Sequence, residues 1–242
     1  MSLFEAKIET LRQALAPLEA EERVFRASGG GAWPRAGSKQ MILEQDMGAE
    51  LGNGRLPSFA AILWTEELER VRDGQIALYG PDIPQIAAPG GKKSVPFGKI
   101  VLLGVDALPA DEVYASYERM DAVRFRQNLS GYMLRGTSQR NREWSRVSKE
   151  ACGAGFCFAH LGSELVRDYK ALPFVRRAEL LFFTEEAGVR ALLPAMSECC
   201  QIARALNTMF EHVSMDCKSC DAAEICEEID GLKQLHRQLS QS

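Results

Sequence analysis

The sequence predicts a mixed α/β protein in which strands and helices alternate within one main domain. Of its 242 residues, 46% are hydrophobic and 26% are charged, which suits a globular chain long enough to bury a core. Short apolar segments separated by glycine and proline fill the range 40–110, as is typical of strands. Beyond it, segments with helical spacing alternate with an apolar strand, which favours the α/β class.

The chain is expected to divide into three segments. Residues 1–38 form a helical segment and a connector, because apolar residues from Phe4 to Val24 recur at helical spacing around a break at Pro17. A glycine-rich run closes this segment at 29–38. Residues 39–210 form the main α/β domain, and residues 211–242 form a cysteine-bearing segment with a C-terminal helix.

Within the main domain the expected strands are 60–64, 75–79, 99–105 and 178–183. The expected helices are 66–72, 111–128, 148–166 and 185–210. The second helix should bury Val113, Tyr117, Met120 and Phe125. Gly153 and Gly155 should divide the third helix, and Pro194 should interrupt the fourth.

Charge and hydropathy exclude several classes of protein. The formal charge of −4 and pI near 5.6 argue against broad nucleic-acid binding, which needs a basic surface. No segment approaches the roughly 18 consecutive apolar residues of a membrane span, and the N-terminus lacks the apolar core of a signal peptide. We therefore expect a cytoplasmic protein whose seven cysteines are thiols or metal ligands rather than disulfides.

Three cysteines close to the C-terminus, Cys217, Cys220 and Cys226, have the spacing of a metal site. The two-residue gap between the first pair lets both sulfurs face one metal ion or one cluster, and the third can return through a loop. The flanking residues are polar, which disfavours the alternative of incidental buried thiols. An iron–sulfur cluster is the favoured occupant, and a tetrahedral zinc ion is the alternative.

The fourth ligand must come from elsewhere in the chain. Cys200 or its neighbour Cys199 is the nearest cysteine, and His212 offers a nitrogen instead. Cys152 and Cys157 lie in an apolar stretch, so we expect them in the core together with a hydrogen-bonded His160.

Four stretches of the chain resemble a known family. Residues 46–63, 73–86, 138–165 and 178–186 are similar to the acetyl-CoA synthase subunit of carbon monoxide dehydrogenase/acetyl-CoA synthase, of the archaeal beta subunit type. The pieces GPDI (80–83), QRN (139–141) and RVSK (146–149) carry most of the specificity.

The resemblance implies a [4Fe–4S] cubane on Cys217, Cys220, Cys226 and a further cysteine such as Cys200. Two departures qualify it: the gap from Cys220 to Cys226 is short, and no fourth cubane cysteine follows. In that family a Cys-Gly-Cys tripeptide chelates nickel, and the tripeptide does not occur in this sequence. The expected function is therefore that of an iron–sulfur protein, non-catalytic alone, in redox or corrinoid-linked one-carbon metabolism, with a redox or corrinoid protein as partner.

The resemblance also implies a coenzyme A site at Trp144, Arg140 and Arg146. Arginine forks pair with phosphate oxygens and an indole face stacks on adenine. The plainer alternative is a solvated strand with scattered charges. Two other functions stay open: a CoA- or partner-binding module with structural zinc, and one half of a split acetyl-CoA synthase. Whether the chain is an enzyme is also left open.

Overall fold

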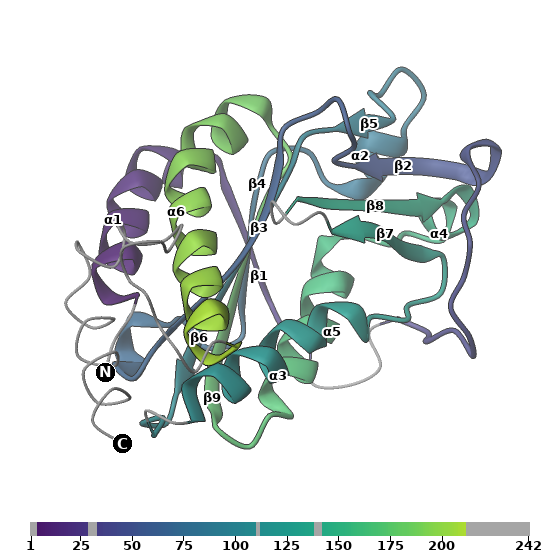
Figure 1. The fold of residues 1–242 in the computed structure, drawn as a ribbon. Helices are drawn as coiled ribbons and strands as arrows, with labels where there is room; N and C mark the ends of the chain where they lie inside the picture. The colour runs from purple at the N-terminus through teal and green to yellow at the C-terminus, as the bar shows by residue number, and fades with distance from the viewer. Residues whose placement is uncertain (1–3, 29–32, 110–111, 138–141, 212–242) are drawn as a thin grey trace.

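The structure is a computed structural model that describes residues 4–28, 33–109, 112–137 and 142–211. Two sheets and the helices around them form one body (Figure 1). Among the described residues, no helix is long and apolar enough to cross a membrane.

A five-stranded sheet forms the centre of the molecule, with strand order β1-β4-β9-β6-β3. These strands are β1 (Glu22–Arg26), β4 (Gln75–Tyr79), β9 (Val175–Phe183), β6 (Phe97–Val105) and β3 (Ser58–Thr65). The β4–β9 and β6–β3 pairs are parallel, whereas β1–β4 and β9–β6 are antiparallel. Every residue of β3, β4 and β6 is buried, because layers cover both faces of this sheet.

Helices cover the two faces of the large sheet (Figure 1). On one face lie α1 (Glu5–Leu15) and α6 (Glu186–Glu211), which contact each other and β3. On the other lie α5 (Phe158–Lys170), which packs on β9 and β4, and α3 (Val113–Phe125). Because α3 contacts both α5 and α6, it closes the open side of the edge strand β3.

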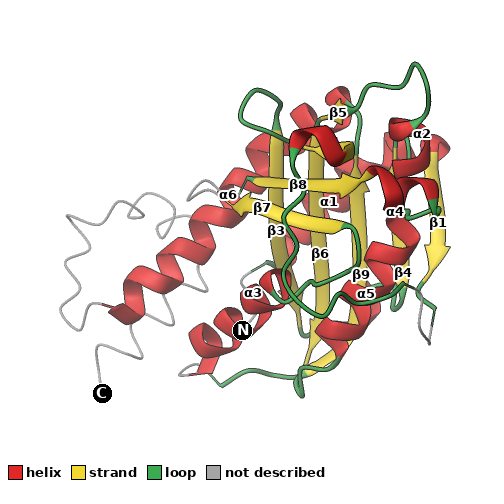
Figure 2. Cartoon of the chain, turned by 90° about the vertical axis from the view of Figure 1, so that its right-hand side faces the viewer, coloured by secondary structure: helices red, strands yellow, loops and turns green. Residues whose placement is uncertain are grey.

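A smaller four-stranded sheet lies across the large one on the α5 side (Figure 2). Its order is β5 (Ser94–Val95), β2 (Met47–Leu51), β8 (Glu143–Ser148) and β7 (Tyr132–Thr137). The β2–β5 pair is parallel, and the β2–β8 and β8–β7 pairs are antiparallel. Strand β8 contacts β3 and β6, and the short helices α2 (Ile83–Ala87) and α4 (Lys149–Gly153) flank this sheet.

The strands with uninterrupted apolar sequence agree with the sequence predictions. Those predicted at 60–64, 75–79, 99–105 and 178–183 correspond to β3, β4, β6 and β9. The helix expected at 111–128 is α3, and the break expected at the two glycines separates α4 from α5.

Four expectations were wrong in detail. Residues 22–26 form β1 rather than helix, so this part of the N-terminal segment belongs to the central sheet. Pro194 lies inside a continuous α6, whose packing on the core outweighs the missing hydrogen bond. Phe125, expected in the core, is 47% exposed. The helix expected at 66–72 shrinks to a single 3-10 turn, η3 (Leu68–Arg70), and further 3-10 turns occur at η1 (Ala16–Glu21) and η2 (Glu44–Asp46).

Candidate functional site

The outer face of the small sheet carries a polar cluster of Trp144, Arg146 and Glu50. Alternate residues of a strand share a face, so β8 presents Trp144 and Arg146 together. Glu50 lies directly opposite Arg146 on β2. Its Oε1 accepts hydrogen bonds from Trp144 Nε1 and Arg146 Nε, both at 2.9 Å. The Arg146 Cζ lies 5.7 Å from the centre of the Trp144 ring, so the cluster is a fixed unit.

The charge of Glu50 is stabilised within this cluster. Burial raises the pKa of the carboxyl, but side-chain hydrogen bonds from Asn53, Arg146, Trp144 and Ser94 outweigh burial, and the net effect is a lowered pKa. Glu50 is therefore an anion that orients its two partners on β8. Arg146 Nη1 also donates to the carbonyl of Ile42 at 3.3 Å, which ties residues 39–43 to the sheet.

An open pocket of about 380 Å³ adjoins the cluster. Residues 39–43, the end of α3 with residues 127–128, strand β7 and Arg146 line it. Met41 is 82% exposed, and Leu43 and Phe125 are about half exposed. The side chain of Gln127 adds a buried Oε1 that has no hydrogen-bond partner. Apolar walls with a few oriented polar groups are typical of a site for an organic ligand.

The structure brings together two of the three residues predicted for coenzyme A. Trp144 and Arg146 share one face, whereas Arg140 lies outside the described residues. Arg146 donates hydrogen bonds to Glu50 and Ile42, which engage two of its nitrogens within the protein. Sequence reasoning missed Glu50 and the segment 39–43, which lines the pocket. The alternation of side chains along the strand sequence EWSRVS could have predicted that Trp144 and Arg146 share one face.

The predicted metal site falls mostly outside the described residues. Cys217, Cys220 and Cys226 lie there, so their role stays a prediction. Cys200 is described: it is partly buried on α6, and its Sγ donates to the carbonyl of Ala60 at 3.8 Å. Within the described part of the chain, no group of three or more metal-ligating side chains comes together.

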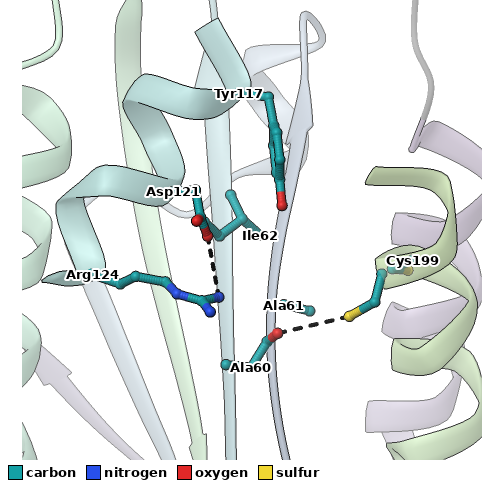
Figure 3. A pocket seen from close by; sticks show the side chains of 8 residues that line it. Ala60, Ala61, Ile62, Tyr117, Asp121, Arg124 and Cys199 are labelled. Carbon is teal, nitrogen blue, oxygen red and sulfur yellow. Dashed lines mark hydrogen bonds and ion pairs between the residues drawn. The ribbon is translucent and has the colours of Figure 1, made fainter. Parts of the chain in front are cut away.

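A small polar cavity surrounds Cys199 and Cys200 where α3 and α6 meet the edge of β3 (Figure 3). Tyr117, Asp121 and Arg124 line it from α3, and Arg124 pairs with Asp121 at 3.2 Å. Its volume of about 10 Å³ suits a single water molecule rather than a cofactor. Burial raises the pKa of Cys199 to about 12, which disfavours the thiolate that a metal ion requires.

Cys152, Cys157 and His160 differ from the expectation that they lie in the core. All three are partly exposed, because the chain turns at the break between α4 and α5 and brings this stretch to the surface. Cys157 Sγ lies 3.2 Å from His160 Nδ1.

Comparison with known proteins places these features in a family. Residues 36–189, which include all of the small sheet, match the family model described as the CO dehydrogenase/acetyl-CoA synthase complex beta subunit. The carbon monoxide dehydrogenase/acetyl-CoA synthase subunit alpha of Moorella thermoacetica is 35% identical over 162 residues, which are 66% of this chain and 21% of that protein.

The acetyl-CoA decarbonylase/synthase complex subunit beta 1 of Methanosarcina acetivorans is 22% identical over 161 residues, which are 66% of this chain and 32% of that subunit. The match thus spans a fifth to a third of these relatives. Since the matched region covers more than half of the chain, with the whole small sheet, four of the five strands of the large sheet and the Trp144–Arg146–Glu50 cluster, the chain belongs to the family of the CO dehydrogenase/acetyl-CoA synthase complex beta subunit.

Proposed function

We propose that this chain is a ligand-binding subunit of a CO dehydrogenase/acetyl-CoA synthase type assembly in the cytoplasm, and that it binds coenzyme A on the outer face of the small sheet. The observation that carries this proposal is the oriented Trp144–Arg146–Glu50 cluster beside the pocket of about 380 Å³. The related subunits are named for acetyl-CoA synthase and acetyl-CoA decarbonylase/synthase, and these names support the choice of ligand.

The chemistry of the cluster and pocket fits the parts of this ligand. The partly exposed indole of Trp144 offers a stacking surface for adenine, a contact worth about 1–3 kcal/mol. The apolar walls suit the pantetheine arm, and Gln127 Oε1 would accept one of its amide N–H groups. Lys39 in the pocket wall and the exposed Arg142 supply positive charge for the phosphates. Arg146, held by Glu50, would orient the indole.

Isothermal titration calorimetry with coenzyme A tests the proposal. Trp144→Ala should weaken binding by at least about tenfold, whereas Trp144→Phe should retain most of the affinity because it keeps an aromatic face. Titration with ADP and with pantetheine separates the contribution of the indole from that of the pocket. The absence of binding heat for the folded native protein would exclude coenzyme A as the ligand.

We further propose that Cys217, Cys220, Cys226 and Cys200 hold a [4Fe–4S] cluster, with zinc as the alternative occupant. The spacing of the first three cysteines supports this proposal. Anaerobically purified protein should be brown and contain about four irons per chain. Cys217→Ser should lose the iron, and Cys152→Ser serves as the matched control that keeps it. A colourless protein with one zinc would support the structural-zinc alternative instead.

We propose that the chain is non-catalytic alone, because its sequence lacks the Cys-Gly-Cys tripeptide named above. It would act with a redox or corrinoid protein, or as one half of a split acetyl-CoA synthase. Family membership supports a protein partner, since the matched family is a subunit of a complex. Co-purification of a nickel protein would favour the split enzyme, and co-purification of a corrinoid protein would favour the accessory role.

A further inference from the structure

The first turn of α5 places a thiol next to an imidazole. Cys157 is the N-cap of this 13-residue helix, and His160 follows three residues later. Residues at this spacing meet on one side of a helix start. The Cys157 Sγ lies 3.2 Å from His160 Nδ1, which is hydrogen-bond distance for sulfur. Both side chains are partly exposed, so solutes can reach the pair.

The surroundings fix the imidazole beside the sulfur. The His160 ring lies 5.0 Å from the ring of Trp33 and is stacked on Phe156 at 6.2 Å. Trp33 is itself anchored, because its Nε1 donates to the carbonyl of Ser130 at 2.8 Å. With one ring edge held between aromatic neighbours, His160 Nδ1 is directed at Cys157 rather than free to rotate away.

The backbone at the helix start opposes the effect of burial on the sulfur but does not cancel it. Burial raises the pKa of Cys157, and the carboxylate of Asp82 raises it further, whereas the backbone N–H groups of His160 and Ala159 lower it. The net effect is a raised pKa, so the group is a thiol at neutral pH. A thiol of this kind needs a base to react, and histidine is the side chain that accepts protons near neutral pH.

We propose that Cys157 is a thiol activated by His160 and that it forms mixed disulfides with small disulfides. The proton of Cys157 moves to His160 Nδ1, and the resulting thiolate attacks one sulfur of the disulfide. The bond between Cys157 and that sulfur forms as the disulfide bond breaks. The leaving thiolate takes the proton from the imidazolium, so charge and electrons balance. One small thiol is released for each protein molecule modified.

Cys152 offers an internal comparison five residues upstream. It is also partly exposed, but it lies on α4, where its sulfur packs against Gly48. Burial raises its pKa to about 11. In the part of the chain that the structure describes, His160 is the one histidine, and its Nδ1 contacts Cys157 rather than Cys152. The two thiols therefore share burial and differ in the base.

The experiment measures the modification of each cysteine in the reduced full-length chain. The protein is mixed with oxidised glutathione or with 4,4′-dithiodipyridine at pH 7 and quenched at intervals, and each cysteine is quantified by peptide mass spectrometry. Cys157 should react at least about tenfold faster than Cys152. His160→Gln should lower the reaction rate of Cys157 by a factor of at least about ten and leave the rate of Cys152 unchanged.

Two outcomes overturn the proposal: a Cys157 rate no greater than that of Cys152 in the native protein, or an unchanged Cys157 rate in folded His160→Gln. If the His160→Gln variant does not fold, the rates of Cys157 and Cys152 in the native sequence, folded and unfolded, test the proposal. The ratio of the two rates should then fall to about one in guanidinium chloride, because unfolding separates His160 from the sulfur. A ratio that survives unfolding would assign the difference to local sequence and contradict the proposal.

Discussion

Each face of strand β8 carries an ion pair, but the two pairs have different surroundings. On the inner face, Glu143 is fully buried and binds the ammonium of Lys99 on β6 with both oxygens, at 2.6 and 2.5 Å. On the outer face, Arg146 pairs with Glu50 beside the partly exposed Trp144 and an open pocket. The inner pair joins the two sheets, whereas the outer cluster faces the space that a ligand could occupy.

The difference suits the inner face of the strand to stability and the outer face to the ligand binding proposed above. Burial lowers the pKa of Lys99, and Glu143 opposes this effect. Removing charges from water is costly, so the cost of burying Lys99 and Glu143 offsets much of their attraction. Arg146 and Glu50 are buried as well, but Trp144 beside them is partly exposed and Arg146 borders the open pocket, where a ligand can replace water. The inner face should therefore respond in stability, and the outer face in affinity.

Breaking the inner pair should have the largest effect. Lys99→Ala leaves the Glu143 carboxylate buried without a partner, and we expect the free energy of unfolding to fall by about 3–5 kcal/mol. Urea denaturation followed by circular dichroism measures it. The double variant Lys99→Met with Glu143→Leu should recover most of that loss, because no charge is then stranded. A single variant as stable as the native protein would show that water reaches this pair.

Removing the outer aromatic ring should affect ligand binding more than folding. Trp144→Ala should weaken coenzyme A binding by about 1–3 kcal/mol in calorimetry. Its loss of stability should be smaller than that of Lys99→Ala, since the indole is partly exposed. The contrast between the two faces would fail if Trp144→Ala unfolded the chain as readily as the inner variant does.

The charge of Glu50 should contribute a smaller, pH-dependent effect. Its folded-state pKa is lowered, so its contribution to stability is present above the unfolded pKa and is lost as pH falls through the folded pKa. Glu50→Gln should lower the free energy of unfolding at pH 7 by about 1–2 kcal/mol. Denaturation curves between pH 7 and about pH 3 should then show a shallower decline for the variant. Equal pH slopes would contradict this role.

An exposed ion pair supplies the smallest expected effect. Arg176 bonds Asp106 at 2.5 and 2.8 Å, but solvent surrounds both side chains. Arg176→Gln should leave the unfolding midpoint unchanged within measurement error, because exposed pairs are screened by water and salt. A clear loss of stability would show that geometry alone, without burial, makes a pair important here.

The sequence predicted the large sheet well and the small sheet poorly, for a physical reason. Strands β4 and β6 are covered on both faces, so their sequences are apolar throughout and easily recognised. Strand β8 has an outer face with the polar Arg146, and the sequence around β7 and β8 is rich in arginine, so this region resembled a solvated strand or loop with scattered charges. Strand β1 was missed because its ERVFR sequence continued the apolar spacing of the preceding helix.

The candidate site was only half accessible to sequence reasoning. The family resemblance identified Trp144 and Arg146, but Glu50, which orients both, is 94 residues from Trp144 and 96 from Arg146. No local pattern reports a contact at that separation. The pairing of Cys157 with His160 spans three residues and could have been predicted from helical spacing once the start of α5 was placed at Phe158.

The strands of the two sheets alternate along the sequence, and this order affects how the protein folds. Strand β2 precedes β3, β5 precedes β6, and the β7–β8 pair lies between α3 and α5, so the small sheet is threaded three times through the connections of the large one. Each sheet therefore pairs strands that are separated in the chain by segments of the other. Such distant pairings slow the search for the native state. Refolding should therefore be a single slow event, and neither sheet should survive excision from the chain.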